Sequence, residues 1–315
     1  MRLVLGADVG GTHLRLGLFD ADSWQLLWQG KRGWRGQDDS PESLAAALLA
    51  TMREASAATG HALTALPLGM GLAAQLSPDG RTVVNGPNLG WRDVAFADRM
   101  EVALGRPTGS IAVCNDLSAI VMGELAAGAA VGVRSLVALY AGTGVGGAAV
   151  VEGRLVRGTG GTAGEVGHMK LPGGQAPCGC GEVGCVESVA GGASLGRRLQ
   201  GVQFATDVAG ELPGDPARLE RAALAGDAEA EGIVAEVVDA LAFAASGLCT
   251  FLNPELLLVG GGLFERAPAL AKRFEARTLA LTLAVARARL EIRRGSLGDE
   301  AGLLGAAHQA LQRLV

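Results

Sequence analysis

The stretch from Leu3 to Asp22, LVLGADVGGTHLRLGLFDAD, is the most informative about the fold of this 315-residue chain. Two short apolar runs are joined by Gly10, Gly11 and Thr12, and this pattern predicts a β-hairpin with a glycine turn. Glycine lacks the side chain that would hold an anion away from the backbone amides. The stretch therefore predicts a hairpin that can hold a phosphate, although a plain tight turn would show the same pattern.

A related pattern returns at residues 135–153, SLVALYAGTGVGGAAVVEG. A strand predicted at 136–140 meets a Gly/Thr turn and is followed by a second strand at 146–151. The turn at 142–147 matches the G-x-G-x-x-G spacing of a dinucleotide site, but a strand follows it where that site requires a helix, so we reject a Rossmann site. The two hairpins predict an internal duplication with one hairpin per lobe. Coincidence in a chain with 49 glycines is the alternative.

Length, composition and charge limit the class of protein. The chain is longer than single hydrophobic cores usually grow, so two lobes are expected, and an apolar fraction of 49% can fill both. The net charge of −5 comes from interspersed acidic and basic residues, which predicts no nucleic-acid partner and no membrane partner. The apolar run before Asp8 is too short for a signal segment. We therefore expect a cytoplasmic protein.

The spacing of apolar residues predicts the other elements. The first helix begins after Ser40 as N-cap, with Pro41 in its first turn, and ends at Gly60. The remaining expectations are buried strands at 67–76 and 110–114, a helix from Asn115, an irregular segment at 201–212, helical residues at 216–252 and 263–278, a strand with a glycine turn at 254–262, and an amphipathic helix at 299–315.

A third glycine turn, VGGGLF at 259–264, completes a set of three. Together the three turns indicate a nucleotide site, in which Asp8 can hold Mg²⁺ through water. A Walker A loop is excluded, because none of the lysines at 31, 170 and 272 has the required spacing.

Asp116 follows Asn115 at the end of a predicted strand, where open α/β sheets place their ligands. As a general base it would accept a hydroxyl proton while a γ-phosphoryl group transfers in line. The alternative is that its carboxylate only caps the following helix.

The stretch at 168–187, HMKLPGGQAPCGCGEVGCVE, holds three of the five cysteines. His168, Cys178, Cys180 and Cys185 predict a closed tetrahedral Zn²⁺ site, which is structural because it leaves no open position for water. Reactive or merely buried thiols are the alternative.

Two glutamates flank the predicted metal ligands. A metal there would also hold Glu165 and Glu187, which could then accept hydrogen bonds from a polyol. Each of them alone could be a solvated surface residue.

At these residues the chain resembles the ROK family of bacterial sugar kinases and sugar-responsive repressors, most closely its glucokinases. The matching motifs are DVGGTHLR, GPNLGWRD, Asn115–Asp116, AGTGVGGA, GEVGH, CGCGEVGCVES and VGGG. The resemblance implies an α/β, two-lobed actin/hexokinase-like (ribonuclease H-like) ATPase fold with duplicated phosphate hairpins and an active site in a cleft. We expect a small lobe at 1–117, joined by the helix at 298–315, and a large lobe at 118–297.

The resemblance also implies roles for individual residues. Asp116 would be the catalytic base toward the sugar 6-hydroxyl, and Asp8 would face the magnesium. The sugar pocket would be lined by Asn88, Asn115, Asp116, Glu165, His168 and Glu187. The nucleotide would contact Gly10, Gly11, Thr12, Gly142, Thr143, Gly144, Gly261 and Gly262.

Two departures from the family pattern matter. Family members often carry Lys after the first Gly-Gly-Thr, where this chain has His13, so a phosphate contact passes to Arg15 or is absent. The helix after Asp116 reads LSAIVMGE at 117–124, not the usual alanine- and asparagine-rich version, which leaves the choice of hexose open.

The leading hypothesis is a hexose kinase acting on glucose that uses ATP, Mg²⁺ and a structural Zn²⁺ and forms a homodimer or homotetramer. Allose, fructose, mannose and N-acetylhexosamines are alternative substrates, and polyphosphate is an alternative donor. A regulator of the same family should carry a helix-turn-helix before the first phosphate motif, but only seven residues precede Asp8. An actin-like or Hsp70-like ATPase should lack the metal loop.

Overall fold

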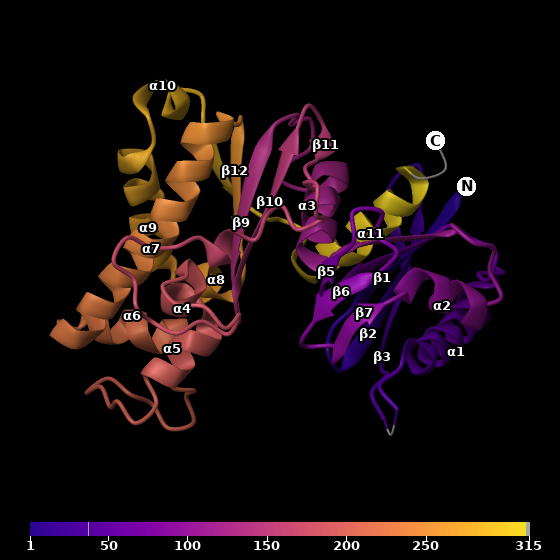
Figure 1. The fold of residues 1–315 in the computed structure, drawn as a ribbon, viewed down its shortest axis with the longest axis horizontal. Coiled ribbons are helices and arrows are strands. Elements are labelled where there is room, and N and C mark those ends of the chain that lie inside the picture. The colour runs from indigo at the N-terminus through magenta and orange to yellow at the C-terminus, as the bar shows by residue number, and fades with distance from the viewer. Residues whose placement is uncertain (37, 313–315) are drawn as a thin grey trace. The chain divides into compact units, whose positions relative to one another are not determined.

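The computed structural model describes residues 1–36 and 38–312, and these divide into two compact units (Figure 1). Unit 1 consists of Met1–Gly132, Leu155–Ala163 and Gly295–Val315, and unit 2 consists of Val133–Arg154 and Gly164–Arg294. This division differs from the expected boundary after residue 117, because the helix that starts there packs inside unit 1.

The sheet of unit 1 begins with the predicted hairpin and has the strand order β3-β2-β1-β4-β8. Strands β1 and β2 are antiparallel, with Asp8 opposite Arg15, whereas β4 and β8 continue the sheet in parallel. The strands are β1 (Leu3–Val9), β2 (His13–Asp20), β3 (Leu26–Gly33), β4 (Leu68–Leu72) and β8 (Ile111–Asn115).

Unit 1 also contains α1, three further α-helices, the short 3-10 helix η2 (Gly298–Glu300) and a small sheet. The predicted ends of α1 are confirmed: the Ser40 side chain accepts a hydrogen bond from the Ser43 N–H, and Gly60 ends the helix at a φ of 74°. The elements are α1 (Pro41–Thr59), α2 (Phe96–Ala103), α3 (Asp116–Ala127), α11 (Ala301–Gln312), β5 (Gln75–Leu76), β6 (Val83–Gly86) and β7 (Trp91–Val94).

The expectation that the closing helix is amphipathic is wrong for its described part. Nearly every residue of α11 is buried, because the helix lies between α3 and the strands β1 and β4. The approach is so close that a Cβ added at Gly305 would overlap the Ala119 carbonyl, and one at Gly69 would overlap the Ala306 carbonyl. Residues 313–315 of the expected helix lie outside the described residues.

The chain entering α11 is held by a buried carboxylate on α3. Glu124, only 1% exposed, accepts hydrogen bonds from the backbone N–H groups of Ser296 (2.8 Å), Leu297 (2.9 Å) and Ala129 (2.7 Å). These bonds satisfy a charge whose burial would otherwise be costly. They tie α3 to the returning C-terminal segment, and both therefore belong to unit 1.

The sheet of unit 2 repeats the plan of unit 1, with the order β11-β10-β9-β12-β13. In both sheets an antiparallel hairpin continues into parallel strands, as the predicted duplication requires. The strands are β9 (Leu136–Ala141), β10 (Val145–Val151), β11 (Arg154–Leu155), β12 (Leu256–Gly260) and β13 (Glu291–Arg294).

The helical stretch predicted at 216–252 is two helices. Gly226, at a φ of 91°, breaks the chain, and the Asp227 side chain caps the second helix by accepting from the Ala230 N–H at 3.0 Å. The helices of unit 2 are η1 (Val166–His168), α4 (Val186–Ala190), α5 (Gly192–Arg198), α6 (Pro216–Leu224), α7 (Ala228–Leu252), α8 (Gly262–Arg266), α9 (Pro268–Leu281) and α10 (Ala284–Arg287). The segment at 201–212 is irregular, as predicted.

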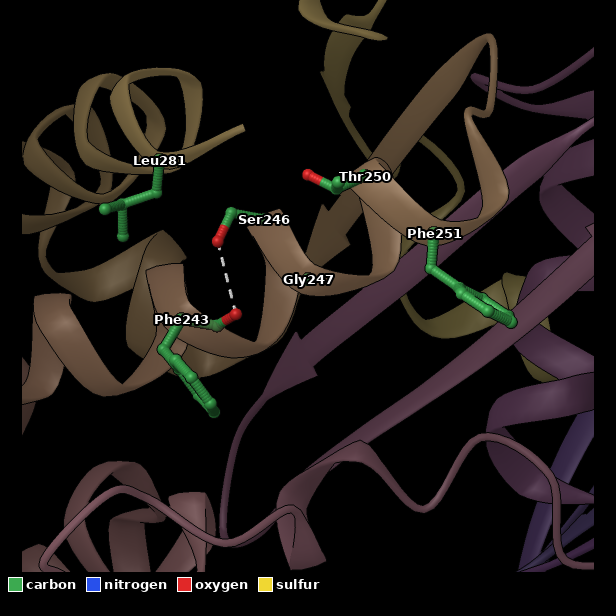
Figure 2. Close-up of a pocket in the computed structure, with 6 residues that line it drawn as sticks. All are labelled: Phe243, Ser246, Gly247, Thr250, Phe251 and Leu281. Carbon is green, nitrogen blue, oxygen red and sulfur yellow. Dashed lines mark hydrogen bonds between the residues drawn. The ribbon is translucent and has the colours of Figure 1, made fainter. Parts of the chain in front are cut away.

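Among the described residues, α7 alone is long and apolar enough to cross a membrane by length and composition. Of its apolar window, 61% is buried inside the protein, which identifies it as a core helix. One face stays exposed: Phe243, Gly247 and Phe251 line a shallow hollow together with Leu281 of α9 (Figure 2). Phe251 is 85% exposed. We call these four residues the α7 patch.

Candidate functional site

The first glycine turn is held in shape by a tryptophan that follows β3. The Trp34 indole N–H donates to the Gly10 carbonyl at 2.9 Å, and the Trp34 backbone N–H donates to the Thr12 carbonyl at 3.3 Å. Gly11 lies against the predicted substrate loop, because a Cβ on it would come within 2.6 Å of the Asn88 carbonyl oxygen. The turn therefore has a defined shape before any ligand binds.

An aromatic cluster joins this turn to the GPNLGWRD segment. The Trp34 and Trp91 rings lie 5.5 Å apart, and the Trp91 and Phe96 rings lie 5.4 Å apart. The Trp91 indole N–H donates to the Asp39 carbonyl at 2.6 Å. Sequence reasoning missed this support, although tryptophan is rare in the chain and one lies inside the matched motif. Because Trp34 and Trp91 are nearly fully buried, they act as a scaffold for the exposed Asn88.

Asp8, the predicted magnesium residue, is paired with Arg15. Its Oδ2 accepts from Arg15 Nε at 3.0 Å and from Arg15 Nη2 at 2.6 Å, and Arg15 Nη1 lies 3.4 Å from the exposed Asp299. Asp8 is largely buried at the end of β1. A single carboxylate beside a turn predicted to hold phosphate fits Mg²⁺, which commonly keeps several waters and binds one or two carboxylates. The pairing also places a cation beside the turn.

Asn115, not Asp116, is the N-cap of α3. Its Oδ1 accepts from the N–H groups of Leu117 (3.0 Å) and Ser118 (3.2 Å), and its Nδ2 donates to the Ala74 carbonyl at 3.2 Å. Asn115 therefore takes the N-cap position that the alternative reading gave to Asp116. Both polar groups of Asn115 are used within unit 1, so the residue positions the start of α3.

Asp116 is the first residue of α3 and is half-buried. Its Oδ1 accepts from the Leu117 N–H at 2.8 Å. Asp8 lies near the end of β1 and Asp116 follows β8, and both are at the same end of the sheet because β1, β4 and β8 are parallel. Unit 1 thus brings the predicted base, the predicted magnesium residue and the first turn to one edge.

The second glycine turn is held by residues from α4 and α5. The Gly192 N–H donates to the Gly142 carbonyl, and the Ala193 N–H donates to the Thr143 carbonyl, both at 2.9 Å. The Glu187 Oε2 accepts from the Val145 N–H, also at 2.9 Å. The turn therefore has three supports outside its own hairpin.

The third turn lies beside the second. Gly261 follows β12 at a φ of 96°, and a Cβ on it would overlap the Ala141 carbonyl at the end of β9. Strands β9 and β12 are parallel neighbours, so their ends and the turns at 142–144 and 261–262 share one edge of the sheet. Unit 2 thus gathers its predicted nucleotide residues, with Gly262 as the first residue of α8.

The four predicted metal ligands converge. One donor atom each from His168, Cys178, Cys180 and Cys185 lies within 4.8 Å of the others. The Cys180 and Cys185 sulfurs are 3.8 Å apart, and the Cys178 sulfur is 3.7 Å from His168 Nδ1. Zn–S bonds of about 2.3 Å in a tetrahedron place two sulfurs about 3.8 Å apart, so the donors fit a closed Zn²⁺ site.

The backbone shapes this metal loop as a short ribbon. Isolated bridges pair Lys170 with Cys185 and Pro177 with Val183. The Lys170 ammonium lies 3.3 Å from the Cys185 sulfur. Lys170 therefore contacts a predicted metal ligand within this ribbon.

His168 links the metal ligands to a predicted sugar residue. Its Nδ1 faces the Cys178 sulfur, whereas its Nε2 lies 3.7 Å from Glu165 Oε2. One ring nitrogen can therefore bind the metal while the other faces the carboxylate. The two residues are placed by η1, which packs so closely on β10 that a Cβ on Gly167 would overlap the Val145 carbonyl.

Known proteins are similar to this chain over nearly its whole length. The model of the ROK family matches residues 4–313. The chain is 30% identical to the glucokinase of Halalkalibacterium halodurans, over 96% of this chain and 93% of that protein. It is similar to the crystal structure of a ROK hexokinase from Thermus thermophilus, with a TM-score of 0.81 and 30% identity over 99% of both chains.

A second solved structure shows ligands. It is a ROK family glucokinase from Streptomyces griseus in complex with glucose and AMPPNP, with a TM-score of 0.77 and 28% identity, covering 98% of this chain and 99% of that chain. These likenesses over the full length confirm the expected hexokinase-like α/β fold.

Proposed function

The chain belongs to the ROK family, and on this premise we propose that it is an ATP-dependent and Mg²⁺-dependent hexose kinase that phosphorylates glucose at its 6-hydroxyl. The observation that carries the proposal is the position of Asp116. Asp116 follows β8, at the same end of the sheet where β1 leads into the first glycine turn. This is where a base for a sugar hydroxyl belongs.

The proton path follows from this position. Asp116 accepts the proton of the 6-hydroxyl as its oxygen attacks the γ-phosphorus of ATP, and the ADP oxygen leaves in line. Magnesium, held near Asp8, neutralises charge on the phosphate oxygens when it is bound. The Asn115 side chain holds the first turn of α3, and therefore keeps Asp116 oriented.

The sugar and the nucleotide use different groups of the chain. The Asn88 amide, the Glu165 and Glu187 carboxylates and His168 Nε2 can each bond a sugar hydroxyl. The backbone N–H groups of the three glycine turns cradle the phosphates. The Cys/His loop holds a structural Zn²⁺, and its part in sugar binding is to orient Glu165 and His168.

A coupled assay of ADP release across a panel of hexoses tests this function. Glucose should give the highest kcat/KM with ATP, and allose, fructose, mannose and N-acetylhexosamines should give lower values. A higher value with one of these sugars would reassign the substrate but keep the kinase. Absence of ADP release with every hexose, while a hexose still binds, would favour the regulator alternative. Replacing ATP with polyphosphate in the same assay determines the donor.

We also propose that the chain acts in the cytoplasm as a homodimer or homotetramer, without a nucleic-acid or membrane partner. The α7 patch supports self-association, because a second copy covering it would remove an exposed phenylalanine from water. Sedimentation velocity checks this. The wild-type chain should sediment as an oligomer, and Phe251→Ser should shift it toward the monomer. A monomeric wild-type chain at micromolar concentration would contradict self-association.

A further inference from the structure

Glu187 contacts both the metal loop and the second glycine turn. Its Oε2 accepts from the Val145 N–H at 2.9 Å, and its Oε1 lies 3.9 Å from the Cys178 sulfur. We propose that the metal loop holds the glycine turn at 142–145 in its nucleotide-binding shape, with Glu187 as the positioning residue that transmits this support. The proposal rests on the proposed function, because that function assigns nucleotide binding to this turn.

A short rigid path connects the metal ligands to the turn. Cys185 is the N-cap residue of α4, so Glu187 lies within the first turn of that helix. The chain then bends at Gly191 into α5, whose first N–H groups donate to the Gly142 and Thr143 carbonyls. Fixing Cys185 therefore fixes the start of α4, and through α4 the two supports that α5 provides.

The segment where α4 turns into α5 packs tightly against the second glycine turn. A Cβ on Gly144 would overlap Glu187 Oε2, and a Cβ on Gly191 would come within 2.8 Å of the Glu187 carbonyl. A Cβ on Gly192 would lie 2.7 Å from the Gly142 carbonyl. Gly192 lets α5 meet the turn backbone to backbone, and Gly144 leaves room for the Glu187 carboxylate, so a shift of α4 and α5 would disturb the turn.

The effect of metal loss on nucleotide binding distinguishes this proposal from the alternative, in which the metal loop supports only the sugar-binding residues. If the loop orients only Glu165 and His168, losing the metal should weaken sugar binding and leave nucleotide binding unchanged. If it also holds the turn, losing the metal should weaken nucleotide binding even when no sugar is present. Nucleotide binding without sugar is therefore the informative quantity.

The first experiment removes the metal by substitution. Cys180 is an exposed ligand that does not touch the turn, so Cys180→Ser should release zinc without disturbing the core. We expect elemental analysis to find about one zinc per wild-type chain and a large loss in the variant. We expect calorimetry with MgAMPPNP, without sugar, to show affinity about tenfold weaker. Cys249→Ser, a cysteine substitution outside the loop, should change neither quantity.

Amide exchange supplies a readout that does not depend on activity. Hydrogen–deuterium exchange at the Val145, Gly192 and Ala193 amides should become faster in Cys180→Ser, whereas exchange in α9 should stay slow. Exchange in α9 as fast as at these amides would report general unfolding. In that case, titration of wild-type protein with a zinc chelator, followed by the same exchange measurement, decides the question.

The second experiment substitutes Glu187, the proposed positioning residue. Glu187→Ala should keep its zinc but lose protection at Val145 and bind MgAMPPNP about tenfold more weakly. Glu182→Gln, in the same loop but on its exposed side, should match wild type. Three results would each overturn the proposal: no zinc in wild-type protein, unchanged nucleotide affinity without zinc, or unchanged exchange at Val145. An inactive wild-type chain that still binds MgAMPPNP would overturn the kinase function and leave this test in force.

Discussion

The two glycine hairpins share a backbone plan but carry different chemistry. In unit 1, the second residue pair from the turn is Asp8 and Arg15, which form an ion pair across the strands. In unit 2, the corresponding pair is Tyr140 and Gly146. The first hairpin thus presents charge beside its turn, whereas the second presents backbone groups. The two hairpins share a backbone shape, but the side chains beside their turns differ in charge.

The turns also differ in what holds them. The first is held by Trp34, which follows the next strand in sequence and buries its ring beside Trp91. The second is held by α4 and α5, which follow the metal loop. A charged turn supported by an aromatic core should respond to mutation differently from an uncharged turn supported by a metal loop. If unit 1 supplies the charges that act on reacting atoms, the largest losses of activity should come from its residues.

The largest expected effect is that of Asp116→Asn. The amide cannot accept the hydroxyl proton, so kcat should fall on the order of 10²–10⁴-fold while sugar binding stays close to wild type. Stopped-flow and steady-state kinetics with glucose measure kcat, and calorimetry measures sugar affinity. Turnover near wild type would remove Asp116 from the role of base.

Asp8→Asn should come next. Loss of the carboxylate would remove the proposed magnesium contact and the closer partner of Arg15, so kcat/KM for MgATP should fall about 10²-fold. The Mg²⁺ concentration that gives half-maximal rate should rise in parallel. Asp299→Asn is the matched control, because it removes the exposed second partner of Arg15 and should change little. Equal effects of both substitutions would contradict a magnesium role for Asp8.

A comparison of Arg15→Ala with His13→Ala locates the phosphate cation of the first turn. Arg15 is half-buried beside Asp8, whereas the exposed His13 lies 2.8 Å from the Thr12 hydroxyl. Arg15→Ala should raise KM for ATP about tenfold, since hydrogen bonds to charged groups are the stronger ones. His13→Ala should stay within about twofold. A larger rise in KM for His13→Ala than for Arg15→Ala would assign the phosphate contact to His13.

The smallest expected effect is that of Trp34→Phe. The ring stays buried, but the hydrogen bond to the Gly10 carbonyl is lost, which should lower the free energy of unfolding by about 1 kcal/mol. KM for ATP should rise by a small factor, about threefold, because the first turn is less well held. Urea unfolding measures the first quantity and steady-state kinetics the second. A loss as large as that of Asp8→Asn would show that the turn depends on its support more than on its charge.

Local signals predicted the parts of the fold that neighbours in sequence determine. The first helix begins and ends where Ser40 and Gly60 indicate, because a cap is made between residues three or four apart. The break at Gly226 was missed, since a single glycine inside a helical pattern is usually tolerated. The burial of α11 was missed as well. Its alternation of small and large residues resembles an amphipathic pattern, but its small residues face other backbones.

The residues of the candidate site likewise fall into those that the sequence predicts and those that only the structure places. The glycine turns and the metal ligands were found from sequence because their residues lie close together in the chain, within 18 residues for His168 to Cys185. The choice between Asn115 and Asp116 as the cap required coordinates, because adjacent residues of similar capping preference give the same signal.

Short spacings in the chain are enough to find the two glycine hairpins, the carboxylate at a strand end and the four clustered Cys/His residues. Which of these features contact one another depends on the packing of the fold. Glu187 and Val145 are 42 residues apart, and Trp34 and Gly10 are 24 residues apart. No spacing rule connects such pairs, because their distance depends on how helices pack on sheets. The link between the metal loop and the nucleotide turn is therefore a property of the fold.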